Sequence, residues 1–274
     1  MHSVHEFQYI TNKRKLIPNF IEAWQQRLLL VSLIKRNLKL RYKQTMLGVL
    51  WVLIQPLAMS GVLVFVFNQF VPSTRGQTCY AGHVLIGVWI WQYFSRSVTD
   101  TSTCLVMFSG VLTKTYFPRI LVPAASVLTG LFDFILLLPI IVGLVYYLYS
   151  PPFQALWLFL PICLLLVCFS IGIGLILSSV NVLYRDIQHA VPFIVQLGFY
   201  LTPVLYQVSA LPERWKWWCQ LNPLTGIIQS VQIIFLGGEL PWTSLLCSTG
   251  IVMAMLFLGA TVFASVEQTM VDKI

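Results

Sequence analysis

The feature of this sequence that most constrains its fold is a run without charge that begins at Gln44 and ends at Thr74. A helix of about 20 apolar residues is long enough to cross the ~30 Å hydrocarbon core of a membrane, so this run can supply one crossing. The composition extends the argument to the whole chain. Of its 274 residues, 58% are hydrophobic and only 9% are charged, whereas soluble domains carry about 25% charged residues. We therefore expect an all-α integral membrane protein.

A basic amphipathic helix is expected just before this run, over residues 20–44. Six apolar residues recur at spacings of three and four: Trp24, Leu28, Val31, Ile34, Leu38 and Tyr42. Polar and cationic residues occupy the opposite face, which is typical of a helix that lies on the membrane surface. A helix of a small soluble domain is the alternative, but some forty residues are few to build a core alone.

Apolar runs predict five further spans, which gives six membrane crossings in a single domain of residues 1–274. The first span covers about residues 48–70, and the others cover about residues 81–106, 120–147, 156–180, 189–206 and 244–265. Pro151 and Pro152 separate the third span from the fourth, because proline interrupts a helix.

Residues 208–243 do not fit a simple crossing. The run from Trp217 to Gly238 is free of charge, but Pro223 and a pair of glycines interrupt it. Tryptophans crowd its start, and tryptophan favours the membrane–water boundary. We expect a re-entrant pair of short external helices, which exists only where protein shelters its ends. A seventh crossing is the alternative.

The distribution of positive charge predicts the orientation. Nine of the 17 Lys and Arg residues lie before Gln44. With six crossings, 13 of them fall on the side of the N-terminus and 3 on the opposite side. Because Lys and Arg accumulate in cytoplasmic segments, both termini are expected in the cytoplasm. The net charge of +8 is therefore a membrane signal rather than a nucleic-acid patch.

Motifs of nucleotide binding and hydrolysis are missing. The sequence contains no GxxxxGK[ST], no GxSxG and no HExxH. Its six cysteines and four histidines show no metal-ligand spacing. We therefore assign no catalytic, cofactor-binding or metal-binding residue to this chain. Cys79 and Cys219 both fall outside in the predicted topology, so a disulfide between them stays open.

Three ionisable residues lie within the predicted spans. Arg96 and Asp100 stand at i and i+4, so they can pair on one helix face. Asp133 has no evident partner. Charged residues inside a membrane either form neutral pairs that help helices pack or mark a substrate path, and both interpretations stay open.

Two predicted cytoplasmic loops combine aromatic and charged residues within a few positions. One runs from Lys114 to Arg119 and the other from Asn181 to Ile187. An aromatic side chain can anchor such a loop in a partner's groove while charges fix its register. Interfacial aromatics beside ordinary positive-inside markers are the other explanation.

Seven segments, in chain order, resemble those of the ABC-2 type permeases that export O-antigen, capsule and teichoic-acid polysaccharides. They are Arg41 to Thr45, then Leu47 and Gly48 with Trp51 and Pro56, then Tyr116 to Arg119, Asn181 to Ile187, Thr202 to Tyr206, Leu211 to Trp215 and Leu221 to Leu224. Each motif is weak alone, but their order over about residues 25–265 is specific. The resemblance implies the permease subunit of an exporter that moves lipid-linked polysaccharide across a bacterial inner membrane.

The same resemblance implies partners and roles. Two copies of the chain would assemble with two copies of an ATP-binding subunit, which would hold ATP and Mg. The helix at 20–44 would be a gate at the inner mouth, with a pyrophosphate lipid head or ordinary anionic lipid bound by Arg36, Lys39, Arg41, Tyr42 and Lys43. The residues that dock on the ATPase and couple it to the permease would be Lys114, Thr115, Tyr116, Phe117, Pro118, Arg119, Tyr184, Arg185 and Asp186.

Candidates for the lining of a conduit are the ionisable residues and aromatic rings that can stack on sugars: Arg96, Asp100, Asp133, Trp51, Tyr93, Tyr200 and Tyr206. Trp89 and Trp91 are expected in the interfacial belt, with sugar stacking as the alternative. An ABC-2 permease for a drug or small lipid is the first alternative function. A membrane enzyme acting on lipid-linked sugars is the second, and it would need Asp133 or His189.

Overall fold

The computed structural model describes residues 24–43, 45–70, 79–112, 117–150 and 156–267, and this part of the chain is helical, without strands. Its α-helices are α2 (Arg27–Tyr42), α3 (Leu50–Phe70), α4 (Tyr80–Met107), α5 (Ser109–Leu112), α6 (Leu121–Tyr149), α7 (Phe159–Leu183), α8 (Ile187–Leu201), α9 (Glu213–Leu221), α10 (Pro223–Leu236) and α11 (Trp242–Glu267). Short 3₁₀ turns, η2 (Leu156–Leu158) and η3 (Val208–Ala210), precede α7 and α9. The all-α class is as predicted.

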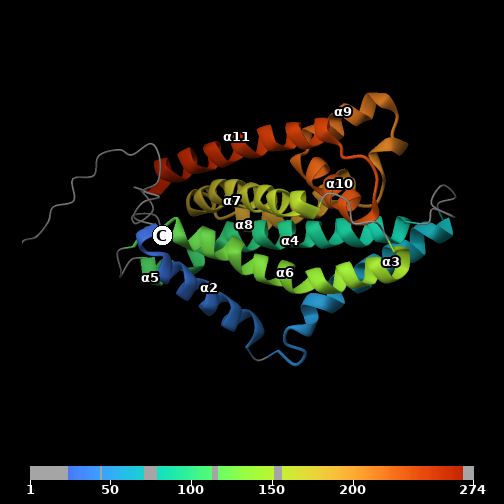
Figure 1. Ribbon diagram of the computed structural model, residues 1–274. Coiled ribbons are helices and arrows are strands. Elements are labelled where there is room, and N and C mark those ends of the chain that lie inside the picture. The colour runs from blue at the N-terminus through green and yellow to red at the C-terminus, as the bar shows by residue number, and fades with distance from the viewer. Residues whose placement is uncertain (1–23, 44, 71–78, 113–116, 151–155, 268–274) are drawn as a thin grey trace, which may run out of the picture.

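The long helices lie side by side as a bundle (Figure 1). The amphipathic helix α2 begins at the end of the bundle where α11 finishes, and α9 lies at the opposite end (Figure 1). Four apolar stretches of the described chain are long enough to cross a membrane: Leu50–Phe70, Leu121–Tyr149, Leu156–Leu183 and Trp242–Glu267.

Two of the predicted spans differ from these four. Helix α4 covers the predicted span 81–106, but polar residues lower its hydropathy. Helix α8 has 15 residues and ends at Leu201, short of the about 20 residues that a perpendicular crossing needs. Pro203 explains the end, because the residue before a proline disfavours the helical conformation. The six-crossing topology therefore stays a prediction.

Helix α4 occupies the centre of the bundle and contacts α3, α6, α7, α8 and α10. Trp89 is only 1% exposed and stacks on Phe134 of α6, with ring centroids 4.2 Å apart. Its indole N–H donates to the backbone carbonyl of Phe134 at 3.2 Å. Trp91 is also buried, against Phe94 and Phe199. The expectation of an interfacial belt for Trp89 and Trp91 is wrong, because the helix that carries them is surrounded by other helices.

Small residues allow α7 and α11 to approach closely. A Cβ atom added to Gly259 would lie 2.3 Å from the backbone oxygen of Gly172. Close backbone contact through glycine is a common way for helices to associate in membranes, where apolar burial alone gives little drive. This contact fixes α11 against α7 in the bundle.

The region predicted as an external helical pair contains two short helices, α9 and α10. Asn222 separates them and caps α10 by accepting from the backbone N–H of Leu224 at 3.1 Å. Gly237 and Gly238 follow α10 with φ of 88° and 126°, a conformation that favours glycine. Helix α10 is mostly buried, whereas α9 buries none of its residues. Cys79 and Cys219, the candidate disulfide pair, are both free thiols.

Candidate functional site: a charged junction between the amphipathic helix and the bundle

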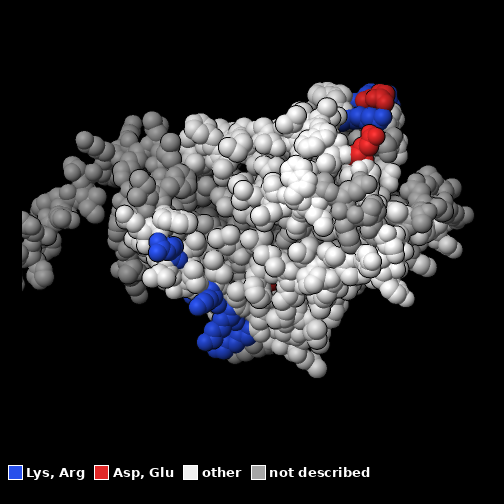
Figure 2. Space-filling model, in the orientation of Figure 1, with Lys and Arg blue, Asp and Glu red and all other residues white. Residues whose placement is uncertain are grey.

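The candidate site lies where the last turn of α2 meets the bundle. The buried residue of α2 is Leu33, and Arg41 follows on the same face two turns later. Leu28 and Val31, from the predicted apolar stripe, are exposed instead. Ile34 and Tyr42 of the same stripe pack on the bundle, so only the N-terminal part of the stripe leaves apolar side chains free for a membrane surface. Lys and Arg side chains gather over α2, with a smaller group of both signs over α9 (Figure 2).

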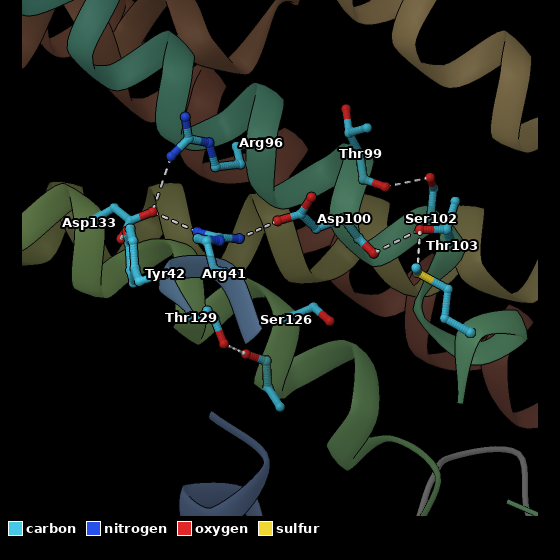
Figure 3. A network of polar contacts seen from close by, with 12 residues as sticks. Arg41, Tyr42, Arg96, Thr99, Asp100, Ser102, Thr103, Ser126, Thr129 and Asp133 are labelled. Atoms are coloured by element: carbon cyan, nitrogen blue, oxygen red, sulfur yellow. Dashed lines mark hydrogen bonds and ion pairs between the residues drawn. The ribbon is translucent and has the colours of Figure 1, made fainter. Parts of the chain in front are cut away.

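Arg41 bridges two helices of the bundle with one guanidinium group. Its Nη1 lies 2.5 Å from Oδ2 of Asp133 on α6, and its Nη2 donates to Oδ2 of Asp100 on α4 (Figure 3). Burial alone would lower the pKa of Arg41, but the two carboxylates outweigh it and raise the pKa above its usual value. The side chain therefore carries a fixed positive charge at this position.

Tyr42 adds a second link to the same carboxylate. Its hydroxyl donates to Oδ1 of Asp133, the oxygen that Arg41 does not use (Figure 3). Burial, together with this hydrogen bond, raises the pKa of Tyr42 to about 12. The phenol is therefore a neutral donor at every physiological pH, and two consecutive residues of α2 hold Asp133.

Arg96 of α4 completes the group. Its Nη1 donates to Oδ2 of Asp133 at 3.1 Å, and its Nη2 donates to Oε1 of Gln55 on α3 at 2.5 Å. The expected pair of Arg96 with Asp100 is wrong, because Asp133 and Gln55 take the guanidinium of Arg96 and Asp100 pairs with Arg41. We call Arg41, Tyr42, Arg96, Asp100 and Asp133 the charged junction.

The charged junction is neutral in sum, and Asp133 is its buried member, whereas the side chains of Arg41, Arg96 and Asp100 stay 22%, 32% and 41% exposed. Two guanidinium groups face two carboxylates, and the side chain of Asp133 is 7% exposed. Removing one of these charges leaves its partners uncompensated, and the cost is largest at Asp133 because its surroundings exclude water. The junction thus ties α2 to α4, α6 and, through Gln55, α3.

A second contact ties α2 to residues on both sides of the first predicted cytoplasmic loop and to Phe117 near the end of the loop. Leu33 shares a small core with Phe108, Phe117 and Ile120, and the guanidinium of Arg36 lies 4.2 Å from the ring centre of Phe108. A cation over an aromatic face at this distance is attractive. Helix α2 is therefore in contact with the loop and with the junction at once.

The predicted coupling residues fall into three groups. Lys114, Thr115 and Tyr116 lie outside the described residues. Phe117 is buried, Pro118 is half-buried, and the side chain of Arg119 donates to the backbone oxygen of Glu267 at the end of α11. In the second loop Tyr184, Arg185 and Asp186 are exposed, Tyr184 by 68%.

The remaining predicted site residues are scattered. Lys39, Lys43, Trp51 and Tyr200 are exposed, and Tyr206 is half-buried. Tyr93 is buried between helices of the bundle, 5% exposed. The sequence analysis missed Gln55, which has no periodic or motif signal that would have singled it out.

The sequence that builds this site also matches known proteins. A family model described as ABC-2 type transporter matches residues 29–236, which include every residue of the charged junction. The chain belongs to the ABC-2 type transporters. It is therefore a transport subunit, and the alternative of a membrane enzyme is set aside.

Individual relatives cover most of this ABC-2 permease. The O-antigen export system permease protein RfbA of Klebsiella pneumoniae is 31% identical over 238 residues, 86% of this chain and 90% of the relative. The protein of the same name from Myxococcus xanthus is 30% identical over 258 residues, 92% of this chain and 98% of the relative. The polysialic acid transport protein KpsM of Escherichia coli is 22% identical over 253 residues, which is 90% of this chain and 97% of the relative.

Proposed function

We propose that this chain is the membrane-spanning permease subunit of an ATP-driven exporter that moves lipid-linked polysaccharide, of the O-antigen kind, across the bacterial inner membrane. The observation that carries the proposal is the similarity, at about 30% identity over nearly the full length of both chains, to permeases named for O-antigen export. No similarity to a drug or small-lipid permease accompanies it among the relatives described above.

The motive force comes from a separate ATP-binding subunit, which holds ATP and Mg. The absence of a GxxxxGK[ST] loop from this sequence supports that division of labour. Two copies of each subunit make up the transporter. Tyr184, Arg185 and Asp186, which are exposed beyond the end of α7, offer an aromatic anchor and two charges to the ATP-binding subunit.

The inner mouth lies at α2. The clustering of Lys and Arg there, and the excess of 13 to 3 in the predicted topology, support a cytoplasmic location for this end of the bundle and for both termini. The lower charge between α2 and α9 in Figure 2 agrees with a membrane-embedded zone between them. Helices α9 and α10 then form the external re-entrant pair.

Helix α2 acts as the gate. It packs against Phe117 of the first loop through Leu33 and against Phe108, at the end of α4, through Arg36. It is bound to α4 and α6 through Arg41 and Tyr42. A push on the loop by the ATP-binding subunit therefore reaches the charged junction through α2. ATP binding favours the state in which the junction is rearranged, because a ligand shifts the equilibrium toward the conformation it binds best.

A deletion of the gene in the bacterium that makes this chain tests the proposal. Cells without the chain lack the polysaccharide on their surface and accumulate the lipid-linked polymer on the cytoplasmic face of the membrane. Expression of the intact chain restores the surface polymer. Normal surface polysaccharide in the deletion strain would contradict the proposal.

A further inference from the structure

Helix α4 carries a polar stripe that the charged junction uses only in part. Residues at spacings of three and four put Gln92, Ser95, Arg96, Thr99 and Asp100 on one face of the helix. With Gln55 and Met59 of α3 they line an open groove of about 480 Å³ between α3 and α4. We call this space the α3–α4 groove.

The polar groups of the groove differ in what they already bind. Arg96 and Asp100 are engaged in the charged junction, and Gln55 accepts from Arg96 through its carbonyl oxygen. Among the described residues, the hydroxyls of Ser95 and Thr99 have no hydrogen-bond partner. The amide of Gln92 reaches only the sulfur of Met59, at 3.8 Å. Two hydroxyls and two amides therefore have hydrogen-bonding capacity left.

Such a surface is unsuited to lipid. Polar side chains within a membrane segment face a water-filled path or other protein, because hydrocarbon cannot satisfy their hydrogen bonds. The volume lies within the range of small-molecule sites, about 300–1,000 Å³. Gln92 and Asp100 are eight residues apart on α4, so the groove extends for about 12 Å along this helix at 1.5 Å per residue.

The chemistry of the free groups selects one class of ligand. Amides and hydroxyls both donate and accept, as the hydroxyl groups of a sugar do. A phosphate would need an uncompensated cation, but the guanidinium of Arg96 is shared between Asp133 and Gln55. An acyl chain would leave the amides and hydroxyls unsatisfied. A neutral, hydroxyl-rich ring fits all of these conditions.

We infer that the α3–α4 groove binds sugar units of the exported polysaccharide as they pass, through the side chains of Gln55, Gln92, Ser95 and Thr99. This inference rests on the proposed function. One end of the groove, at Arg96 and Asp100, belongs to the charged junction that holds α2. A glycan that enters past α2 therefore reaches the groove directly from the charged junction.

Photo-cross-linking tests the inference in the transporter assembled with its ATP-binding subunit. A benzophenone amino acid replaces Met59, which lines the groove, and radiolabelled lipid-linked glycan from the native cells is the probe. The matched control replaces Met253, an exposed methionine of α11. Labelled sugar attached at position 59 and not at 253 supports the inference. A cross-link to a second copy alone, or no sugar at position 59, overturns it.

A kinetic variant gives an independent measurement. Gln92→Leu keeps the side chain's size and removes its hydrogen bonds, so the glycan concentration for half-maximal export rises about fivefold. Thr261→Val on α11, whose hydroxyl bonds only the backbone of its own helix, is the control and leaves that concentration unchanged. An unchanged concentration in Gln92→Leu, while the unmodified transporter still exports the glycan, refutes the inference about the groove and leaves the proposed function standing. Failure of the unmodified transporter to export the glycan would instead refute the proposed function.

Discussion

Arg41 and Asp133 are 92 residues apart in the sequence, yet their side chains lie 2.5 Å apart and join the amphipathic helix α2 to α6 in the bundle. Tyr42 holds the other oxygen of the same carboxylate. The contact fixes α2, which membrane lipid alone would hold loosely, against the bundle. In the proposed function, rearrangement of this contact opens the inner mouth.

Asp133→Asn tests whether this contact holds α2. The substitution keeps the shape and removes the charge that Arg41, Tyr42 and Arg96 share. Amide hydrogen exchange in α2 should accelerate about tenfold, equivalent to about 1.4 kcal/mol of local stability, and export should fall while the chain still inserts and assembles. Glu239→Gln, at an exposed carboxylate, is the control. Normal export and unchanged exchange in Asp133→Asn would assign the aspartate no part in gating.

The pKa of Tyr42 gives a separate test of the charged junction. Because burial raises the pKa of Tyr42 to about 12 from 10.0, its neutral form stabilises the folded state below pH 10, and that contribution is lost as pH rises through 12. An absorbance titration of tyrosinate should show one group fewer near pH 12 in Tyr42→Phe than in the intact chain. Loss of a group that titrates near pH 10 instead, the value of a phenol in water, would contradict the buried hydrogen bond to Asp133.

Coupling to the ATP-binding subunit is expected at the exposed second loop. Arg185→Ala or Tyr184→Ala should weaken co-purification with that subunit about tenfold, since a single interface anchor contributes more than about 1 kcal/mol. Membrane insertion should not change. Arg214→Ala, on α9 at the far end of the bundle, is the control. If both loop variants assemble and turn over ATP normally, the ATP-binding subunit docks on another surface of the permease.

The contact of α7 with α11 predicts opposite effects for two glycines of one helix. Gly259→Ala places a methyl group against the backbone of Gly172 and should lower the free energy of unfolding by about 1–3 kcal/mol. Gly250→Ala meets no atom within 4 Å and should stabilise α11 by about 0.5–1 kcal/mol. Denaturation in mixed micelles measures both. Equal effects would mean that the close approach does not exist.

Local sequence patterns predicted the features that depend on neighbours along the chain. The all-α class, the basic helix at α2 and the pair of short helices at α9 and α10 follow from charge-free runs, helical spacing and Pro or Gly interruptions. The partner of Asp133 could not be predicted in this way, because Arg41 and Tyr42 reach it only through tertiary packing. Trp89 shows the same limit: an indole suits a membrane boundary and a bundle core equally well, and only the surroundings of α4 decide.

The most direct test of the account is transport by purified components in lipid vesicles. The permease is reconstituted with and without its ATP-binding subunit, and the appearance of lipid-linked polysaccharide on the far face is measured with ATP and Mg. The account predicts ATP-dependent translocation when both proteins are present and none by the permease alone. Uphill movement of the glycan by the permease without its partner, or its absence when both are active in ATP turnover, would contradict the account.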